Sequence, residues 1–304
     1  MAFESARIDP GTCIGFGGTN ARVAACEDGD ISGFTSVETP NRPEQFFRWM
    51  ARNLLNSSHE GGSWLVAGFP GPVSIDGAKV GPLVNVTGMK EEEYDLAAQL
   101  TAADSEVGRV LEQGFTLLAV NDGTLAAQAV ASRIGRHQYS KTGALIIGTG
   151  IGAGVVKKDS DYNDVHRVVN DPLEIGHMLV SGESFESFEQ RYSGPGLERR
   201  FGVPPTKISA GHPAWIEEGE AIGRLSLTLG ILNGVDLVVP TGGIGIGASQ
   251  MYGYHLRSFL DTYREKWNAT QRKFMPEIVL VPSVEVDEFE MYGAEGVMRD
   301  YLSA

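Results

Sequence analysis

Cysteine is scarce in this sequence, which holds only Cys13 and Cys26 in 304 residues. Two cysteines exclude a framework of several disulfides and a cysteine-rich zinc knuckle. Both lie in apolar runs near the N-terminus, where a buried thiol is the usual state of the residue. The fold must therefore rest on a hydrophobic core, for which a chain of this length has ample apolar content.

Positive charge is also in short supply. The chain carries 25 Lys and Arg against 39 Asp and Glu, a net charge of −14 at pH 7. Nucleic-acid binding needs clustered basic side chains that release counterions from the phosphates, and anionic membranes attract the same side chains. The balance therefore argues against both kinds of partner and indicates an acidic soluble protein.

Long apolar runs are missing as well. No run approaches the roughly 20 residues needed to cross a bilayer. The first twelve residues, MAFESARIDPGT, lack the basic stretch followed by an apolar one that marks a secretory signal. We therefore expect a cytoplasmic protein.

Strand and helix patterns alternate along the rest of the chain. Short apolar runs bounded by glycine turns predict strands first, and helical apolar spacing begins at residues 46–55. The alternation occurs twice, with further strands from residue 144 and long helices at residues 214–232 and 252–267. The repetition predicts an α/β protein of two related lobes, with a site in the cleft between them.

Three glycine-rich turns are the first candidates for chemistry. They are Gly17-Gly18-Thr19, Gly148-Thr149-Gly150-Ile151-Gly152-Ala153-Gly154 and Thr241-Gly242-Gly243-Ile244-Gly245. Glycine lets backbone N–H groups approach an anion closely, and threonine adds a hydroxyl donor. One such turn is usually only a hairpin, but three in one chain favour phosphate binding. None has the spacing of a P-loop.

Asn121-Asp122 ends an apolar run at residues 115–120 and precedes a helical pattern. Asn-Asp-Gly is an ordinary turn and helix-cap signal, and the residues alone favour that interpretation. The functional alternative is a carboxylate at the carboxyl end of a strand, where ligands collect in open α/β sheets.

Other polar residues lie in unusual places. Glu174 and His177 are three residues apart beside a glycine, as in a buried hydrogen-bonded pair or a ligand site, and Asn85 lies between valines. Carboxylate, amide and imidazole groups together suit a polyol, since each sugar hydroxyl both donates and accepts hydrogen bonds. Three further glutamates recur at the three-residue spacing typical of a solvated helix face: Glu183, Glu186 and Glu189.

In this order, the motifs resemble those of the ROK (repressor, open reading frame, kinase) sugar kinases and the related bacterial glucokinases of the hexokinase–actin superfamily. The resemblance runs from about Cys13 to the C-terminal helix. Residues 17–22 resemble the first phosphate motif in its glucokinase form, residues 148–154 the second, and Gly242-Gly243 the adenosine motif. The resemblance implies an α/β, two-lobed actin-like ATPase (ribonuclease H-like) fold with an interdomain cleft. The small lobe would comprise residues 1–121 and 291–304, and the large lobe residues 122–290.

The resemblance also implies roles for single residues. Asp122 would be the catalytic general base and would contact the sugar, and Glu189 would bind sugar as well, in spite of its helix-face spacing. The other sugar-binding residues would be Asn85, Asn121, Glu174 and His177. ATP would be held by Gly17, Gly18, Thr19, Asn20, Gly148, Thr149, Gly150, Gly152, Gly242 and Gly243. Mg²⁺ would accompany the nucleotide, with no protein ligand assigned to it.

Two departures from the family pattern matter. ROK kinases usually carry a cysteine-rich zinc motif after the Gly-His, whereas residues 182–188 contain no cysteine. We therefore expect no zinc and a His177 that is free to bind sugar. At Gly15 the family has an aspartate associated with Mg²⁺ and phosphate, so a carboxylate is missing from an otherwise complete site.

The sequence thus predicts an ATP-dependent hexose kinase that phosphorylates the sugar 6-hydroxyl, with a glucokinase favoured by the Thr-Asn-Ala-Arg form of the first motif. The alternative, motivated by Gly15, is a sugar-binding pseudokinase with impaired catalysis. A ROK-type repressor is disfavoured, because only about a dozen residues precede the first glycine turn, too few for a helix-turn-helix. The choice of hexose or amino sugar stays open, as does the oligomeric state, although homodimers are common in the family.

Overall fold

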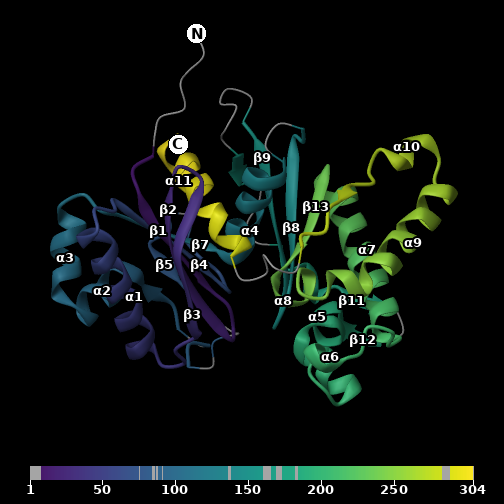
Figure 1. Ribbon diagram of the computed structural model, residues 1–304, viewed down its shortest axis with the longest axis horizontal. Coiled ribbons are helices and arrows are strands. Elements are labelled where there is room, and N and C mark those ends of the chain that lie inside the picture. The colour runs from purple at the N-terminus through teal and green to yellow at the C-terminus, as the bar shows by residue number, and fades with distance from the viewer. Residues whose placement is uncertain are drawn as a thin grey trace, which may run out of the picture.

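The computed structural model describes residues 8–74, 76–83, 86, 88–90, 92–135, 138–159, 166–168, 173–181, 184–282 and 288–303. Two five-stranded sheets organise the chain and lie on either side of a buried helix, α4 (Asp122–Val130), as Figure 1 shows. Within the described ranges, no helix is both long enough and apolar enough to cross a membrane.

The first sheet has the strand order β3-β2-β1-β4-β7. β1 (Gly11–Phe16), β2 (Asn20–Glu27) and β3 (Asp30–Glu38) form an antiparallel meander. β4 (Trp64–Phe69) pairs with β1 in parallel, and β7 (Thr116–Asn121) pairs with β4 in parallel. β1 and β4 are buried along their whole length, as is usual for strands covered on both faces.

The second sheet repeats this arrangement in the order β10-β9-β8-β13-β14. β8 (Lys141–Ile147), β9 (Ile151–Lys158) and β10 (His166–Val168) are antiparallel neighbours. β13 (Leu237–Thr241) runs parallel to β8, and β14 (Glu277–Ile278) runs parallel to β13. The predicted α/β fold with two related halves is confirmed. The exact division of the chain into lobes stays a prediction.

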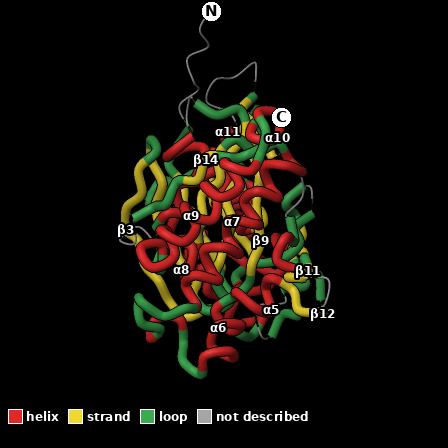
Figure 2. Tube along the Cα trace, turned by 90° about the vertical axis from the view of Figure 1, so that its right-hand side faces the viewer, coloured by secondary structure: helices red, strands yellow, loops and turns green. Residues whose placement is uncertain are grey.

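Helices cover the outer faces of both sheets. α1 (Pro43–His59), α2 (Leu96–Ala103) and α3 (Ser105–Glu112) share a hydrophobic cluster with the first sheet. α5 (Phe188–Tyr192), α6 (Gly194–Phe201), α7 (Ala214–Asn233) and α9 (Ser249–Lys266) share another with the second sheet, and Figure 2 shows α7 and α9 in front of its strands. The helices expected at residues 214–232 and 252–267 are therefore present.

The shorter elements complete the chain. They are β5 (Lys79–Val80), β6 (Tyr94–Asp95), β11 (Leu179–Ser181), β12 (Ser184–Ser187), α8 (Gly242–Gly245), α10 (Ala269–Arg272), α11 (Ala294–Leu302), the π-helical turn η1 (Ala131–Gly135) and the 3₁₀ turns η2 (Ile175–His177), η3 (Pro205–Lys207) and η5 (Phe289–Gly293). β12 occupies part of the segment in which the glutamate spacing predicted a helix face. That prediction is wrong for Glu186, which lies in β12 and pairs with Arg191 at 3.0 Å.

α4 is packed on two sides. Residues 123–130 are all buried. Leu125 contacts the cluster that joins α11 and η5 to the first sheet, whereas Ala126 and Ala129 belong to the cluster on the second sheet. The small alanine side chains let the second sheet approach the helix closely. Because α4 begins directly after β7, its first turn lies at the junction of the two halves.

The glycines of residues 150–154 explain one wrong expectation. The stretch from Gly148 to Gly154 was expected to be a loop throughout, but β9 begins at Ile151. A Cβ on Gly154 would collide with the carbonyl of Gly123 in the first turn of α4. Gly154 therefore serves close packing of a strand on a helix, which a sequence pattern cannot distinguish from a phosphate-binding turn.

Candidate active site

Asn121 and Asp122 lie where β7 ends and α4 begins. The Asn121 side chain caps the helix, since its Oδ1 accepts a hydrogen bond from Gly123 N at 2.7 Å. Its Nδ2 donates to Gly71 O at 2.9 Å. The cap interpretation of this residue is therefore confirmed, and the bond to Gly71 ties the first turn of α4 to the segment after β4. The predicted contact with sugar is a separate matter and stays a prediction.

Asp122 is half-buried beside this cap. Burial, followed by the negative charge of Glu290, raises its pKa to about 8, and Glu174 adds to the rise. A hydrogen bond from Gly123 N at 2.8 Å opposes the rise by stabilising the carboxylate. A carboxyl group with a pKa near neutrality can take up a proton and release it again under physiological conditions, as a general base must.

Two hydrogen bonds from Thr39 fix the backbone of the first glycine turn. Thr39 N donates to Thr19 O at 2.9 Å, and Thr39 Oγ1 donates to Gly17 O at 2.8 Å. Gly17 N bonds to Asn20 O at 2.8 Å and closes the turn between β1 and β2. Gly18 is half-buried, and Thr19 and Asn20 are exposed. The turn therefore has a fixed backbone with exposed polar groups at its end.

The second glycine turn meets the first. The hydroxyls of Thr19 and Thr149 are 3.3 Å apart, although 130 residues separate them in the sequence. Gly148 N bonds to Gly150 O at 2.9 Å, and Gly148 O accepts from Gly194 N, the first residue of α6, at 2.7 Å. The contact brings together one turn from each sheet, as binding of a single phosphate chain would require.

The third glycine turn lies next to the second. Gly242 has a φ of +80°, and a side chain there would meet Ile147 O. The Cβ position of Gly148 lies 3.9 Å from Gly243 N. The first of the predicted phosphate and nucleotide turns thus contacts the second, and the second lies beside the third. Gly152 belongs to β9, and the space where its side chain would lie is open.

The predicted sugar-binding residues are placed as follows. Glu174 precedes η2 and His177 is its last residue, with Glu174 Oε2 and His177 Nε2 3.5 Å apart and both side chains more than half exposed. A Cβ on Gly176, between them in the sequence, would collide with the carbonyl of Ile151, so η2 packs against the second glycine turn. Glu189 is anchored to the second turn, because its Oε2 accepts from Ile151 N at 2.8 Å. Asn85 lies outside the described residues.

The space beside Gly15 is occupied by a side chain from near the C-terminus. A Cβ on Gly15 would collide with the terminal methyl of Met291 in η5. Glu290 directly precedes Met291, and its carboxylate lies 4.0 Å from Arg22. Arg22 is the residue of β2 that pairs with Gly15 of β1. Burial raises the pKa of Glu290, and Arg22 lowers it. Sequence reasoning missed Glu290, and its one signal is a charge between Phe289 and Met291, two residues that are both buried.

The donor set of the site suits Mg²⁺. Within the described residues, no three His, Cys, Asp or Glu side chains are grouped as a metal cage. Mg²⁺ rarely needs such a cage, since it is usually held by one or two carboxylates together with substrate phosphates and water. Glu290, which lies 4.0 Å from Arg22 beside the strand that carries Gly15, can supply such a carboxylate. It fits a cation brought by a nucleotide.

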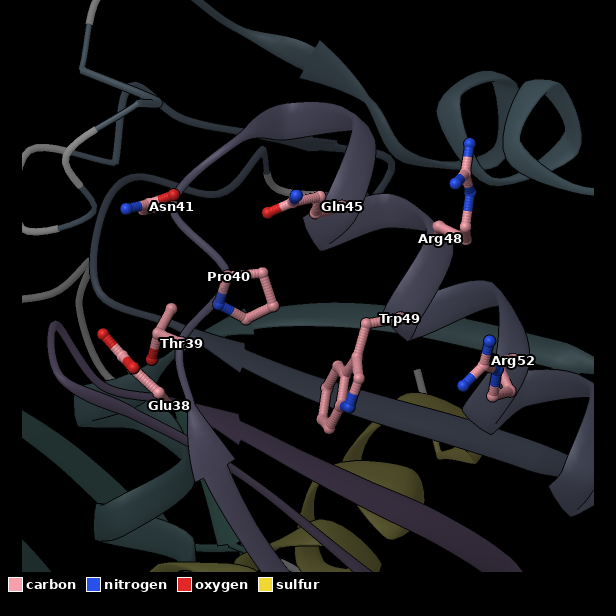
Figure 3. A pocket seen from close by; sticks show the side chains of 8 residues that line it. All are labelled: Glu38, Thr39, Pro40, Asn41, Gln45, Arg48, Trp49 and Arg52. Atoms are coloured by element: carbon pink, nitrogen blue, oxygen red, sulfur yellow. The ribbon is translucent and has the colours of Figure 1, made fainter.

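A cavity of about 460 Å³ lies apart from Asp122, between the end of β3 and α1. Figure 3 shows Trp49 and Gln45 directed toward the β3–α1 connection, whereas Arg48 points away from it. Its lining residues are Glu38, Thr39, Pro40, Asn41, Gln45, Arg48, Trp49 and Arg52. Its two cationic side chains, Arg48 and Arg52, do not converge on one point.

Comparison with solved structures identifies the architecture. The ROK hexokinase of Thermus thermophilus aligns over 97% of this chain and 98% of its own, with a TM-score of 0.67 and 20% identity. The ROK family glucokinase of Streptomyces griseus, solved with glucose and AMPPNP, aligns over 95% and 98%, with a TM-score of 0.66 and 16% identity. This chain has the fold of the ROK sugar kinases.

A third solved structure shows the range of activities on this fold. The inorganic polyphosphate/ATP-glucomannokinase of Arthrobacter aligns over 98% of this chain and 100% of its own, with a TM-score of 0.62 and 20% identity. No protein-family model and no curated protein sequence matches the chain. The solved structures thus confirm the fold that the motifs implied, and the choice of activity rests on the site.

Proposed function

We propose that this protein is an ATP-dependent hexose kinase, with glucose as the favoured substrate and Asp122 as the general base. The observation that carries the proposal is the placement of Asp122. It lies at the carboxyl end of β7, and the next residue, Gly123, packs against Ala153 and Gly154. These two residues end the second glycine turn, whose Thr149 meets Thr19 of the first. Ligands of open α/β sheets bind at such strand ends.

In the proposed reaction, the sugar 6-hydroxyl attacks the γ-phosphorus of ATP and the bond to the ADP oxygen breaks. Asp122 accepts the hydroxyl proton, and Gly123 N holds the carboxylate in place. Backbone N–H groups of the glycine turns and the hydroxyls of Thr19 and Thr149 contact the phosphates. Mg²⁺, when bound with the nucleotide, supplies positive charge that offsets the phosphate oxygens.

The sugar would be oriented by polar side chains close to the second glycine turn. We assign Glu174 and His177 to sugar hydroxyls, together with Oε1 of Glu189, whose Oε2 is already bonded to Ile151. Asn121 contributes by fixing Gly71 and the first turn of α4, and Asn85 keeps the sugar contact implied by the family. Correct positioning of two reactants can account for about 7–11 kcal/mol of a barrier, so these residues matter for rate as well as for binding.

The competing proposal is a sugar-binding pseudokinase, and Gly15 is the observation in its favour. Loss of one partner of a metal site typically reduces activity only about 10–100-fold, so we favour a working enzyme. A cytoplasmic location, where ATP is available, fits the proposal. The neighbours named above include a hexokinase, a glucokinase and a glucomannokinase that also uses polyphosphate, so the sugar and the phosphoryl donor need a direct test.

The test is a coupled assay with ATP and Mg²⁺ on a panel of hexoses and N-acetylated hexosamines, with sugar binding followed in parallel by thermal shift. The kinase proposal expects ATP-dependent turnover of at least one sugar. Sugar binding with no turnover on any member of the panel would favour the pseudokinase.

A further inference from the structure

η5 lies directly against the first half of α4. A Cβ on Gly293 would collide with the carbonyl of Leu125, so the two backbones are in contact there. In a 3₁₀ helix, side chains three residues apart are on the same side. Glu290 precedes Gly293 by three residues and therefore lies on the side of η5 that faces α4, the helix that begins with Asp122.

The same turn also covers Gly15. The Met291 methyl occupies the space where a side chain at position 15 would lie. Arg22, which is opposite Gly15 in the ladder, is 4.0 Å from Glu290 Oε2. The Glu290 carboxylate is thus held between the strand that carries Gly15 and the helix that carries Asp122.

Burying the Glu290 carboxylate in its charged form costs free energy unless a cation lies nearby. The Glu290 side chain is only 14% exposed, and that of Arg22 is 16% exposed. Buried carboxylates in proteins are normally paired or bound to metal. Here Arg22 lies 4.0 Å from the Glu290 carboxylate, farther than the roughly 2.7–3.2 Å of a hydrogen-bonded pair. The local charge balance therefore favours a further cation when the site is occupied.

We propose that Glu290 supplies, from η5, the carboxylate that position 15 lacks, and that it faces the Mg²⁺ bound with the nucleotide. The proposal rests on the proposed function, because it presumes that a nucleotide binds at the glycine turns. It goes beyond that function by assigning the metal-facing carboxylate to a residue from the other end of the chain. Position 15 and residue 290 would then be alternative sources of one charge.

The test measures metal binding directly. Mn²⁺ replaces Mg²⁺ in the presence of ADP, and free Mn²⁺ is counted by electron paramagnetic resonance with the full chain at equilibrium. Glu290→Gln, which keeps the shape of the side chain and removes its charge, should weaken Mn²⁺ binding about 10–100-fold. The matched control is Glu288→Gln, an exposed residue of the same segment, which should bind Mn²⁺ as the wild type does.

A transfer experiment separates charge from general damage. Gly15→Asp combined with Met291→Ala, which removes the obstructing methyl, should restore Mn²⁺ binding to the Glu290→Gln protein. If Glu290→Gln does not fold, Glu290→Asp withdraws the carboxylate by one methylene and should weaken binding less strongly but measurably. Unchanged Mn²⁺ affinity in the folded Glu290 variant, or equal weakening in Glu288→Gln, would overturn the proposal.

The outcome is independent of the sugar assay. Should the wild type phosphorylate a hexose while Glu290→Gln binds Mn²⁺ normally, the role of Glu290 fails and the kinase stands. Should no hexose be phosphorylated while Glu290→Gln loses Mn²⁺, the kinase fails and the role of Glu290 stands. A wild type that binds no Mn²⁺ with ADP would overturn the role of Glu290 whatever the sugar assay gives.

Discussion

Two carboxyl groups of this protein have the same raised pKa in very different surroundings. Burial raises the pKa of Asp122 to about 8 at the start of α4, and burial raises the pKa of Glu218 to about 8 within α7. Glu218 is fully buried, and neither of its oxygens has a hydrogen-bond partner among the described residues. Asp122 is half-buried and accepts a hydrogen bond from Gly123 N.

The comparison shows that a perturbed pKa alone does not locate a site. Glu218 lies within α7, a helix that packs on the outer face of the second sheet. Asp122 lies at a strand end, on the helix between the sheets. Perturbed groups occur at functional sites and in structural cores alike, so the geometry around the group decides which it is.

Substitutions of Asp122 and Glu218 should differ most in their effect on turnover. Asp122→Asn should lower kcat about 10²–10⁴-fold, the usual contribution of a general base, and should leave sugar-induced thermal shifts largely intact. Glu218→Gln should keep kcat within about two-fold, because α7 holds no reacting group. Steady-state kinetics on both variants checks this, and an Asp122→Asn protein with near-native turnover would remove Asp122 from the mechanism.

The next difference is in pH dependence. Asp122 must be deprotonated to accept a proton, so kcat/KM for the sugar should fall about tenfold for each pH unit below about 8 and level off above it. Glu218→Gln should leave this profile where it is. A profile that is flat between pH 6 and about 9, or one that moves in Glu218→Gln, would contradict the assignment.

Neutral substitutions of Asp122 and Glu218 should change the pH dependence of the free energy of unfolding in the same way. A carboxyl group whose folded-state pKa lies above its ordinary value binds its proton more tightly when folded, so its contribution to stability is lost as pH rises toward about 8. Relative to wild type, Glu218→Gln and Asp122→Asn should therefore gain at least about 1 kcal/mol in the free energy of unfolding between about pH 5 and pH 8.5. Urea unfolding at both pH values measures the gain, which should be present in both variants even though only one loses activity.

The smallest effect concerns the charge of Glu290. Because that charge raises the pKa of Asp122, Glu290→Gln should move the acidic limb of the kcat/KM profile to lower pH. The same measurement on Glu288→Gln is the control. A limb that moves to higher pH would show that Glu290 affects Asp122 by something other than its charge.

Much of the fold was predictable because it depends on local patterns. The long helices α7 and α9 and the strand before Asp122 follow from apolar spacing and from the turn residues that bound them. Local sequence patterns were not enough to predict the structure of residues 148–154. Glycine permits both a phosphate-binding turn and the contact of Gly154 with the Gly123 carbonyl, and only the packed structure distinguishes them.

The sequence was enough to predict the motifs of the site, but it could not predict which of their residues contact one another. The motif positions name Thr19 and Thr149 separately, but their contact joins turns 130 residues apart. Glu290 could not be foreseen beside Arg22 for the same reason, since the two are brought together by the return of the chain through η5 and α11 to the first sheet. Gly15 looked like a lost carboxylate because the residue that fills its space, Met291, belongs to the far end of the chain.

The most direct test of the account is the sugar panel with the wild-type protein and Asp122→Asn side by side, with the product identified by its site of phosphorylation. We predict ATP- and Mg²⁺-dependent transfer to the 6-hydroxyl of at least one hexose by the wild type. Asp122→Asn should lose that transfer by about two orders of magnitude or more. Sugar binding without phosphoryl transfer in the wild type, or equal rates in the two proteins, would contradict it.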